Sequence, residues 1–177
     1  MLEPSASIRV CGPHDAAALS LLGRATFLEA YAGLLPASDI LAHCQRAHSP
    51  AVYRAWLARS DTRLWLAEAL PGNAPIGYQV LGVPDLPLAD LTAHDLEIKR
   101  IYLLQRFRGL GLGRRLVQAA SDYARERGGR RLLLGVYSGN HAALAFYEHL
   151  RFQRVGARTF HVGHRDYADH VLALRLE

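Results

Sequence analysis

The sequence is poor in cysteine and has neither a long apolar run nor a dense basic run. Its two cysteines, Cys11 and Cys44, lie far apart and form no CxxC pair, so a disulfide framework is excluded. No stretch reaches the roughly 18 apolar residues that suggest a membrane span. The N-terminus lacks a basic region followed by an apolar core, so no secretory signal is expected. These absences predict a cytoplasmic protein with reduced cysteines and no membrane partner.

The positive charge of the chain is spread along its length. The net charge is +5, yet no run of about five basic residues marks a nucleic-acid tail. One group of arginines, Arg106, Arg108, Arg114 and Arg115, flanks a glycine-rich segment. A small polyphosphate ligand accounts for this group as well as a nucleic acid duplex does, and no nucleic-acid-binding motif is present. Nucleic acid is therefore not an expected partner.

Length and hydrophobic pattern predict one α/β domain. The chain has 177 residues, of which 50% are hydrophobic, enough for one core. Strand–helix–strand segments in the middle indicate parallel pairing, and hairpins at both ends indicate antiparallel pairing, so we expect a mixed sheet with helices on both faces. Strands are predicted at 8–10, 63–68, 76–81, 96–104, 131–136, 152–160 and 167–176, helices at 14–34, 38–47, 49–59, 111–127 and 140–149, and a loop at 83–94.

A glycine-rich loop joins a predicted strand to a predicted helix. Glycines at 109, 111 and 113 allow close backbone approach and positive φ. The loop N–H groups and the helix N-terminus then create an anion site, which a pyrophosphate fits. A dinucleotide fingerprint, GxGxxG, fails because Arg114 stands at its sixth position, and the P-loop pattern is absent. The alternative is a glycine-rich helix entry that holds no ligand.

The loop resembles the signature of a known enzyme family. Arg108, Gly111 and Gly113 match [QR]-x-x-G-x-[GA], and the order of elements resembles the GCN5-related N-acetyltransferase (GNAT) family throughout. Within it, the segments 27–31, 96–103 and 162–174 most resemble the spermidine/spermine (PaiA-like) bacterial branch. The resemblance implies one N-acetyltransferase domain over residues 1–177, with a mostly antiparallel seven-stranded sheet and a splayed parallel central pair.

The resemblance also implies acetyl-CoA as co-substrate. Pantetheine is expected to pair with the backbone of the last strand residues before the loop, with the Leu103 N–H polarising the thioester carbonyl. The pyrophosphate is expected to take loop N–H groups. The implied cofactor-binding residues are Ile101, Tyr102, Leu103, Arg108, Gly109, Leu110, Gly111, Leu112, Gly113, Arg114 and Asn140.

The segment 138–147 supplies the predicted acid. Asn140, Ala143, Phe146 and Tyr147 match the family's N-x-x-A-x-x-F-Y pattern. Asn140 and Tyr147 are seven residues apart and share a helix face, whereas Phe146 is expected to point toward the core. By the resemblance, Tyr147 protonates the thiolate of coenzyme A as it leaves. The alternative for Tyr147 is a half-buried packing role.

A base is needed because amines are mostly protonated at neutral pH. Glu97 is the predicted base, because it lies on the expected substrate strand, with alternation placing it on the same face as Leu103. An ion pair with Lys99 or Arg100, or an anchor for a substrate ammonium, is the alternative role. His94 and Asp95 are alternative bases.

The acceptor site is less defined. Phe27 and Tyr31 are the expected acceptor-binding residues by the resemblance, with core packing as the alternative. The predicted reaction is direct attack of a primary amine of a small, polyamine-like molecule, for which Glu29, Asp39 and Asp85 are carboxylate candidates. The alternatives are a protein or peptide N-acetyltransferase and a non-catalytic acyl-CoA-binding module.

The histidines near the C-terminus do not predict a metal centre. His161, His164, Asp166 and His170 straddle two predicted strands and a turn, without the spacing of a ligand motif. No metal is therefore expected. The expected partners are a small-molecule amine or a peptide acceptor, and a homodimer is left open.

Overall fold

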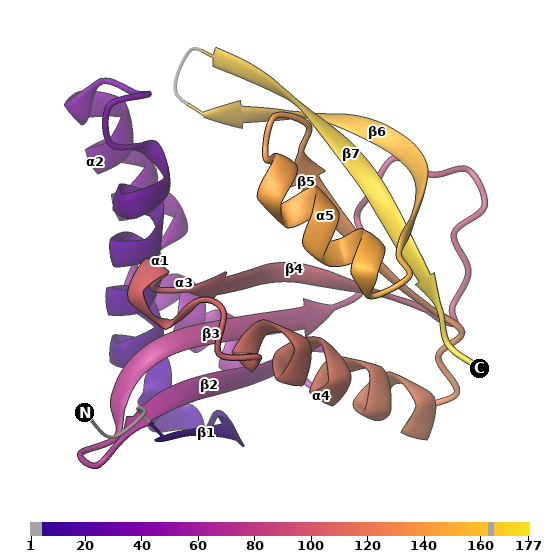
Figure 1. Ribbon diagram of the computed structural model, residues 1–177, viewed down its shortest axis with the longest axis horizontal. Coiled ribbons are helices and arrows are strands. Elements are labelled where there is room, and N and C mark those ends of the chain that lie inside the picture. Colours follow the sequence, from indigo (N-terminus) through magenta and orange to yellow (C-terminus); the bar gives the residue numbers. More distant parts are fainter. Residues whose placement is uncertain (1–4, 163–164) are drawn as a thin grey trace. The chain divides into compact units, whose positions relative to one another are not determined.

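The computed structural model describes residues 5–162 and 165–177; His164, weighed above as a metal ligand, lies outside them. Figure 1 shows the strands and helices labelled in chain order, with three α-helices between the first two strands. Within the described residues no helix is long and apolar enough to cross a membrane. The strands are β1 (Ser5–Val10), β2 (Arg63–Leu70), β3 (Ala74–Gly82), β4 (Asp95–Leu103), β5 (Arg131–Tyr137), β6 (Gln153–Val162) and β7 (Arg165–Arg175), and the helices are α1 (Ala16–Tyr31), α2 (Ala37–Ala47), α3 (Pro50–Leu57), α4 (Leu112–Glu126) and α5 (His141–His149).

The strands form the predicted mixed sheet. Seven strands are hydrogen-bonded in the order β1-β2-β3-β4-β5-β7-β6. β1 pairs antiparallel with β2, and β7 pairs antiparallel with both β5 and β6. β4 and β5 pair in parallel. Their register runs from Asp95↔Arg131 to Glu97↔Leu133 and then ends, although β4 continues to Leu103 and β5 to Tyr137.

The chain divides into two compact units. The first unit contains residues up to Val80 together with Arg100–Leu116, and the second contains Leu81–Lys99 together with Val117–Glu177. In the first unit, α1 and α3 cover one face of β2 and β3, where Leu66 is buried. The next residue, Ala67, faces the other side and packs near the first residue of α4, Leu112, as strand alternation requires. This unit therefore has helices on one face of its strands and the start of α4 on the other.

Local signals in the sequence explain where several helices begin and end. Asn140 caps α5 by accepting a hydrogen bond from the Ala143 N–H at 3.1 Å. After α4, Gly128 adopts a φ of +73°, which glycine tolerates best. The predicted helix 14–34 is shorter than expected. It ends at Tyr31, because Ala32 has an extended ψ of 128° and Gly33 a φ of +82°.

The second unit has a core built on β5, β7 and the long loop 83–94. Leu133 and Val171 are fully buried, and loop side chains pack against them. Arg131 holds the loop by a fork to Asp95, with Nε–Oδ1 2.8 Å and Nη2–Oδ2 2.7 Å, and by a 2.7 Å pair with Asp90. The segment is a loop, as predicted, but it is anchored like an element of the core.

Candidate functional site

The glycine loop of the first unit has the backbone that its sequence predicts. Gly109 has a φ of +81° and Gly111 a φ of +74°, in the left-handed region that favours glycine. A Cβ at either position would meet no heavy atom within 4 Å. Glycine is therefore required by conformation and not by crowding, and residues 108–111 are exposed to solvent.

The N-terminus of α4 presents unpaired N–H groups next to this loop. The first helical hydrogen bond runs from the Arg115 N–H to the Gly111 carbonyl at 3.1 Å. The N–H groups just before Arg115 therefore lack acceptors within the helix, as at every helix start. Leu112, 2% exposed, fixes this end in the core, while Arg114 is exposed. Free N–H groups, the helix dipole and flanking arginines together form an anion-binding arrangement.

The end of β4 leads into the loop through one short 3-10 helix, Gln105–Phe107. Tyr102 is 37% exposed, and its ring stacks on Tyr78 with centroids 5.8 Å apart. The Leu103 side chain packs inward, and Gly77 leaves room for it, because a Cβ at Gly77 would lie 2.3 Å from Leu103 Cδ2. The side chain of Leu103 is therefore structural, and the cofactor role predicted for residues 101–103 rests on their backbone.

Glu97, the predicted base, lies in an ion cluster of the second unit. Its side chain is 3% exposed, and Lys99 Nζ lies 2.8 Å from Oε2. The Asp85 N–H donates to Oε2 at 3.1 Å, and Arg158 Nη1 lies 3.8 Å from Oε1. Burial raises the pKa of the Glu97 carboxyl, and the Lys99 ammonium opposes that rise. The ion pair with Lys99, weighed as an alternative role, is present, whereas Arg100 bonds elsewhere.

The alternative bases have less suitable surroundings. The Arg131 fork lowers the pKa of Asp95, which weakens it as a proton acceptor. His94 is exposed, and its Nδ1 lies 3.0 Å from the Gly128 carbonyl. Glu97 and Asp95 are both buried, but only the pKa of Glu97 is raised by its surroundings, whereas that of Asp95 is lowered.

Tyr147 and Phe146 differ in burial from the expectation. Tyr147 is 7% exposed, and its ring makes edge contacts with Phe146 at 5.1 Å and Phe152 at 5.4 Å. Phe146, expected in the core, is only half-buried. The reason is Phe152, which follows α5 and packs on the Tyr147 side of the helix. The Asn140 side chain caps α5 and therefore has a structural role as well.

The predicted acceptor residues belong to an aromatic cluster of the first unit. Phe27 is 4% exposed; its ring stacks on His43 at 4.1 Å and lies tilted against Tyr31 at 4.4 Å. Core packing, the alternative role, therefore describes Phe27. Tyr31, at the end of α1, is half-buried. The Glu29 carboxylate accepts a hydrogen bond from the Gln105 N–H at 3.1 Å.

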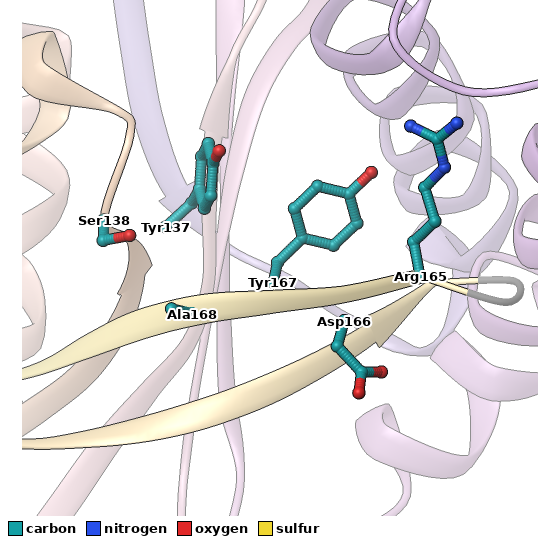
Figure 2. A pocket seen from close by; sticks show the side chains of 6 residues that line it. All are labelled: Tyr137, Ser138, Arg165, Asp166, Tyr167 and Ala168. Carbon is teal, nitrogen blue, oxygen red and sulfur yellow. The ribbon is translucent and has the colours of Figure 1, made fainter.

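A pocket that the sequence did not predict lies in the second unit, at the end of β5 and the start of β7. Figure 2 shows the rings of Tyr137 and Tyr167 and the Arg165 side chain on one side of β7, with Asp166 turned away. The two rings meet edge to face at 5.5 Å, and Asp166 pairs with His161. The Tyr137 ring lies against Gly139, where a Cβ would come within 2.6 Å of it. The sequence signal that could have indicated this pocket is Gly139, two residues after Tyr137.

No metal or disulfide chemistry is apparent within the described residues. They contain no group of three histidine, cysteine, aspartate or glutamate side chains that could hold a metal ion. Cys11 and Cys44 are both free. Burial raises the pKa of the Cys11 thiol to about 12, so it is unreactive as a thiolate at neutral pH.

Comparison with known proteins identifies the family. A model of the Acetyltransferase (GNAT) family matches residues 30–152, more than half of the chain. The chain therefore belongs to the GNAT family. It is 34% identical over 96 residues to an uncharacterized N-acetyltransferase in the pepI 3' region of Lactobacillus delbrueckii, and 41% identical over 90 residues to the N-alpha-acetyltransferase RimI of Mycobacterium tuberculosis.

The extent of these matches differs between sequence and structure. The two sequence matches cover 54% and 51% of this chain, and the chain spans about half of each relative, 56% and 52%. The PaiA N-acetyltransferase of Thermoplasma acidophilum, solved in complex with coenzyme A, matches with a TM-score of 0.71 and 20% identity, over 94% of this chain and 98% of that one. At that identity the structural match shows a common fold.

Proposed function

We propose that this protein is an acetyl-CoA-dependent N-acetyltransferase formed by one domain over residues 1–177. The observation that carries the proposal is the loop ending at α4, with Gly109 and Gly111 in the left-handed region and free helix N–H groups beside it. In a member of the GNAT family, an anion site of this kind suits the pyrophosphate of coenzyme A. The PaiA neighbour, solved with coenzyme A, supports the same ligand.

The cofactor is proposed to contact both the loop and the end of β4. Arg108 and the N–H groups from Gly109 to Arg114 would hold the pyrophosphate. The backbone of residues 101–103 would pair with pantetheine as an added strand. The Leu103 N–H would then donate to the thioester carbonyl and stabilise the oxyanion that forms there. No metal is needed, because the thioester is already activated.

The reaction is proposed to be direct transfer in a ternary complex. The amine nitrogen attacks the carbonyl carbon, the new C–N bond forms, and the C–S bond breaks with its electron pair leaving on sulfur. Glu97 would take the proton that the amine loses, directly or through water. Tyr147 would give a proton to the thiolate, which is feasible because thiols and phenols have pKa values near 8.5 and 10.

The acceptor is proposed to be a primary amine of a small molecule. The PaiA-like resemblance favours a polyamine-like compound, but the Glu29 and Asp85 carboxylates, two candidates for binding it, already have protein partners. A protein α-amine is the second candidate, which the name of the RimI relative favours.

Ligand binding followed by thiol release tests this proposal. Acetyl-CoA should raise the melting temperature of the protein, because a ligand that binds the folded state stabilises it, and NAD should not. Incubation with a panel of amines and peptides should then release free coenzyme A. No shift with any acyl-CoA would refute the proposal. Binding without release by any acceptor would favour a non-catalytic acyl-CoA-binding module.

A further inference from the structure

The guanidinium of Arg100, on β4 in the first unit, is held by neutral groups only. Its Nη1 donates to the Tyr53 hydroxyl at 2.9 Å and to His48 Nδ1 at 3.1 Å. The Arg100 Cζ also lies 4.6 Å from the centroid of the Trp56 ring, a cation–π distance. Tyr53 is 0% exposed and His48 3%, so the guanidinium is fixed by buried partners.

None of these partners can balance the charge near neutral pH. Burial and the nearby Arg100 charge lower the pKa of His48 to about 3, so the imidazole is neutral and accepts through Nδ1. Burial raises the pKa of the Tyr53 phenol, which is neutral as well. Across residues 5–162 and 165–177, Arg100 takes part in no ion pair.

One edge of the guanidinium is left for a ligand. The two Nη1 hydrogens serve Tyr53 and His48, which leaves the Nε and Nη2 donors of Arg100 without an acceptor among the described residues. That edge matches the two oxygens of a carboxylate side-on. Elsewhere in this protein the same edge holds carboxylates: Arg131 on Asp95, Arg59 on Asp61 and Arg9 on Glu68.

The position of Arg100 connects it to the acceptor side of the first unit. The Tyr53 hydroxyl donates to Tyr78 at 3.0 Å, and both tyrosines belong to the core that α1 and α3 cover. The His48 ring lies 5.8 Å from Phe27, a residue of the helix predicted to bind the acceptor. Arg100 is itself only half-buried, so solvent reaches it.

We propose that Arg100 binds a carboxylate of the acceptor, so that the acceptor is an amino-acid-like compound carrying both a primary amine and a carboxylate. This inference rests on the proposed function and gives its substrate class. A polyamine, which is cationic throughout, would be repelled by an uncompensated guanidinium. A single arginine edge between aromatic rings suits one planar carboxylate, whereas phosphate groups are better served by the loop at α4.

Matched pairs of acceptors that differ only in the carboxylate test the inference. Lysine is compared with cadaverine, ornithine with putrescine, and phenylalanine with phenethylamine, each by initial rates of thiol release with acetyl-CoA. A charge-assisted bidentate contact should favour the carboxylated member by roughly 10- to 100-fold in kcat/KM. The ratio within a pair is insensitive to the fraction of folded protein, because both members meet the same sample.

Variants then assign the preference to Arg100. Arg100→Gln should reduce the ratio to about 1, and Arg100→Lys, which keeps the charge but not the fork, should retain part of it. Arg46→Gln removes the same charge from an exposed position of α2 and should leave the ratio unchanged. Melting curves of all variants show whether Arg100 is also needed for folding.

Four results would overturn the inference. The first is an equal or better rate with the carboxylate-free member of the pairs that react. The second is that no pair reacts while acetyl-CoA still binds. The third is a preference that persists in Arg100→Gln. The fourth is a rise in the KM for acetyl-CoA, and not for the acceptor, in that variant, which would make Arg100 a cofactor phosphate contact. Failure of acetyl-CoA to bind the wild type refutes the proposed function instead.

Discussion

Lys99 Nζ lies 2.8 Å from Glu97 Oε2. The carboxylate predicted to act as base is therefore held in an ion pair by a residue two positions further along its own strand. Asp85 completes this arrangement from the loop, with its carboxylate 3.2 Å from the same ammonium. The pair can hold Glu97 ionised despite its burial, which is the state that a base requires. The ion pair and the proposed base role are therefore compatible, and pH dependence separates them.

The rate should depend on the ionisation of Glu97. A base works when unprotonated, so kcat/KM should rise with pH through the Glu97 pKa, which burial raises. Lys99→Met removes the opposing charge and should move this rise of kcat/KM to higher pH. Lys99→Arg, which keeps the charge, should return the rise to its wild-type position. Glu97→Gln should abolish the rise of kcat/KM with pH and lower kcat/KM by roughly 100-fold or more. An identical pH profile in Glu97→Gln would assign the base to another group.

Removal of the Tyr147 hydroxyl should lower turnover more than it lowers acetyl-CoA affinity. Tyr147→Phe keeps the ring contacts with Phe146 and Phe152, and melting curves show how far the fold is retained. We expect kcat to fall by roughly 100-fold, the lower end for loss of a general acid. Tyr123→Phe, on α4, is the control. Undiminished turnover in Tyr147→Phe would mean that the thiolate takes its proton from water.

Two glycines with the same backbone conformation allow a controlled test of the loop. Gly111 and Gly33 have φ values of +74° and +82°, and a Cβ on either meets nothing within 4 Å. Alanine at each position should therefore destabilise the fold similarly, by about 1 kcal/mol. Only Gly111→Ala should weaken the binding of acetyl-CoA, with a Kd roughly tenfold higher, or about 1.4 kcal/mol. Equal affinities in calorimetry would remove the loop from the cofactor site.

The buried histidines should make the protein sensitive to mild acid. Burial lowers the pKa of His43 to about 4 and of His48 to about 3, from 6.5. Between each lowered pKa and 6.5, the unfolded chain binds protons that the folded protein does not. The stability that the neutral histidines contribute is therefore complete above about pH 6.5 and declines as pH falls. At pH 5 the loss is roughly 2 kcal/mol for each histidine.

Urea unfolding between pH 7 and pH 5 measures this effect. His43→Gln should flatten the decline, because the neutral amide has no proton to gain. His149→Gln removes a histidine that is exposed on α5 and should leave the slope unchanged. The same slope in the wild type and both variants would show that His43 does not govern acid stability.

Local patterns predicted the elements better than the contacts between them. The helix end near residue 127, the helix start near residue 140 and the glycine loop each depend on residues close in sequence, and each was predicted. The Arg100 contacts with His48 and Tyr53 join positions 52 and 47 residues apart, and no sequence periodicity encodes them.

The Tyr147 prediction shows where pattern reasoning fell short. Helical spacing placed Tyr147 and Phe146 on different faces, but it could not tell which face meets Phe152. Likewise, the sequence suggested Lys99 as a partner of Glu97 because the two are neighbours on a strand. It gave no sign of Arg158, which reaches Glu97 from β6. Burial of a side chain is set by segments that pack on it from elsewhere.

The Lys99 ion pairs have a consequence for the protein's own chemistry. Lys99 is the only lysine in the sequence, and its side chain is 17% exposed and held by two carboxylates. All other basic residues apart from histidine are arginines, whose guanidinium stays protonated and is a poor nucleophile toward a thioester. A chain proposed to handle an activated acetyl group thus exposes no freely accessible lysine amine of its own, and self-modification at lysine has one shielded target.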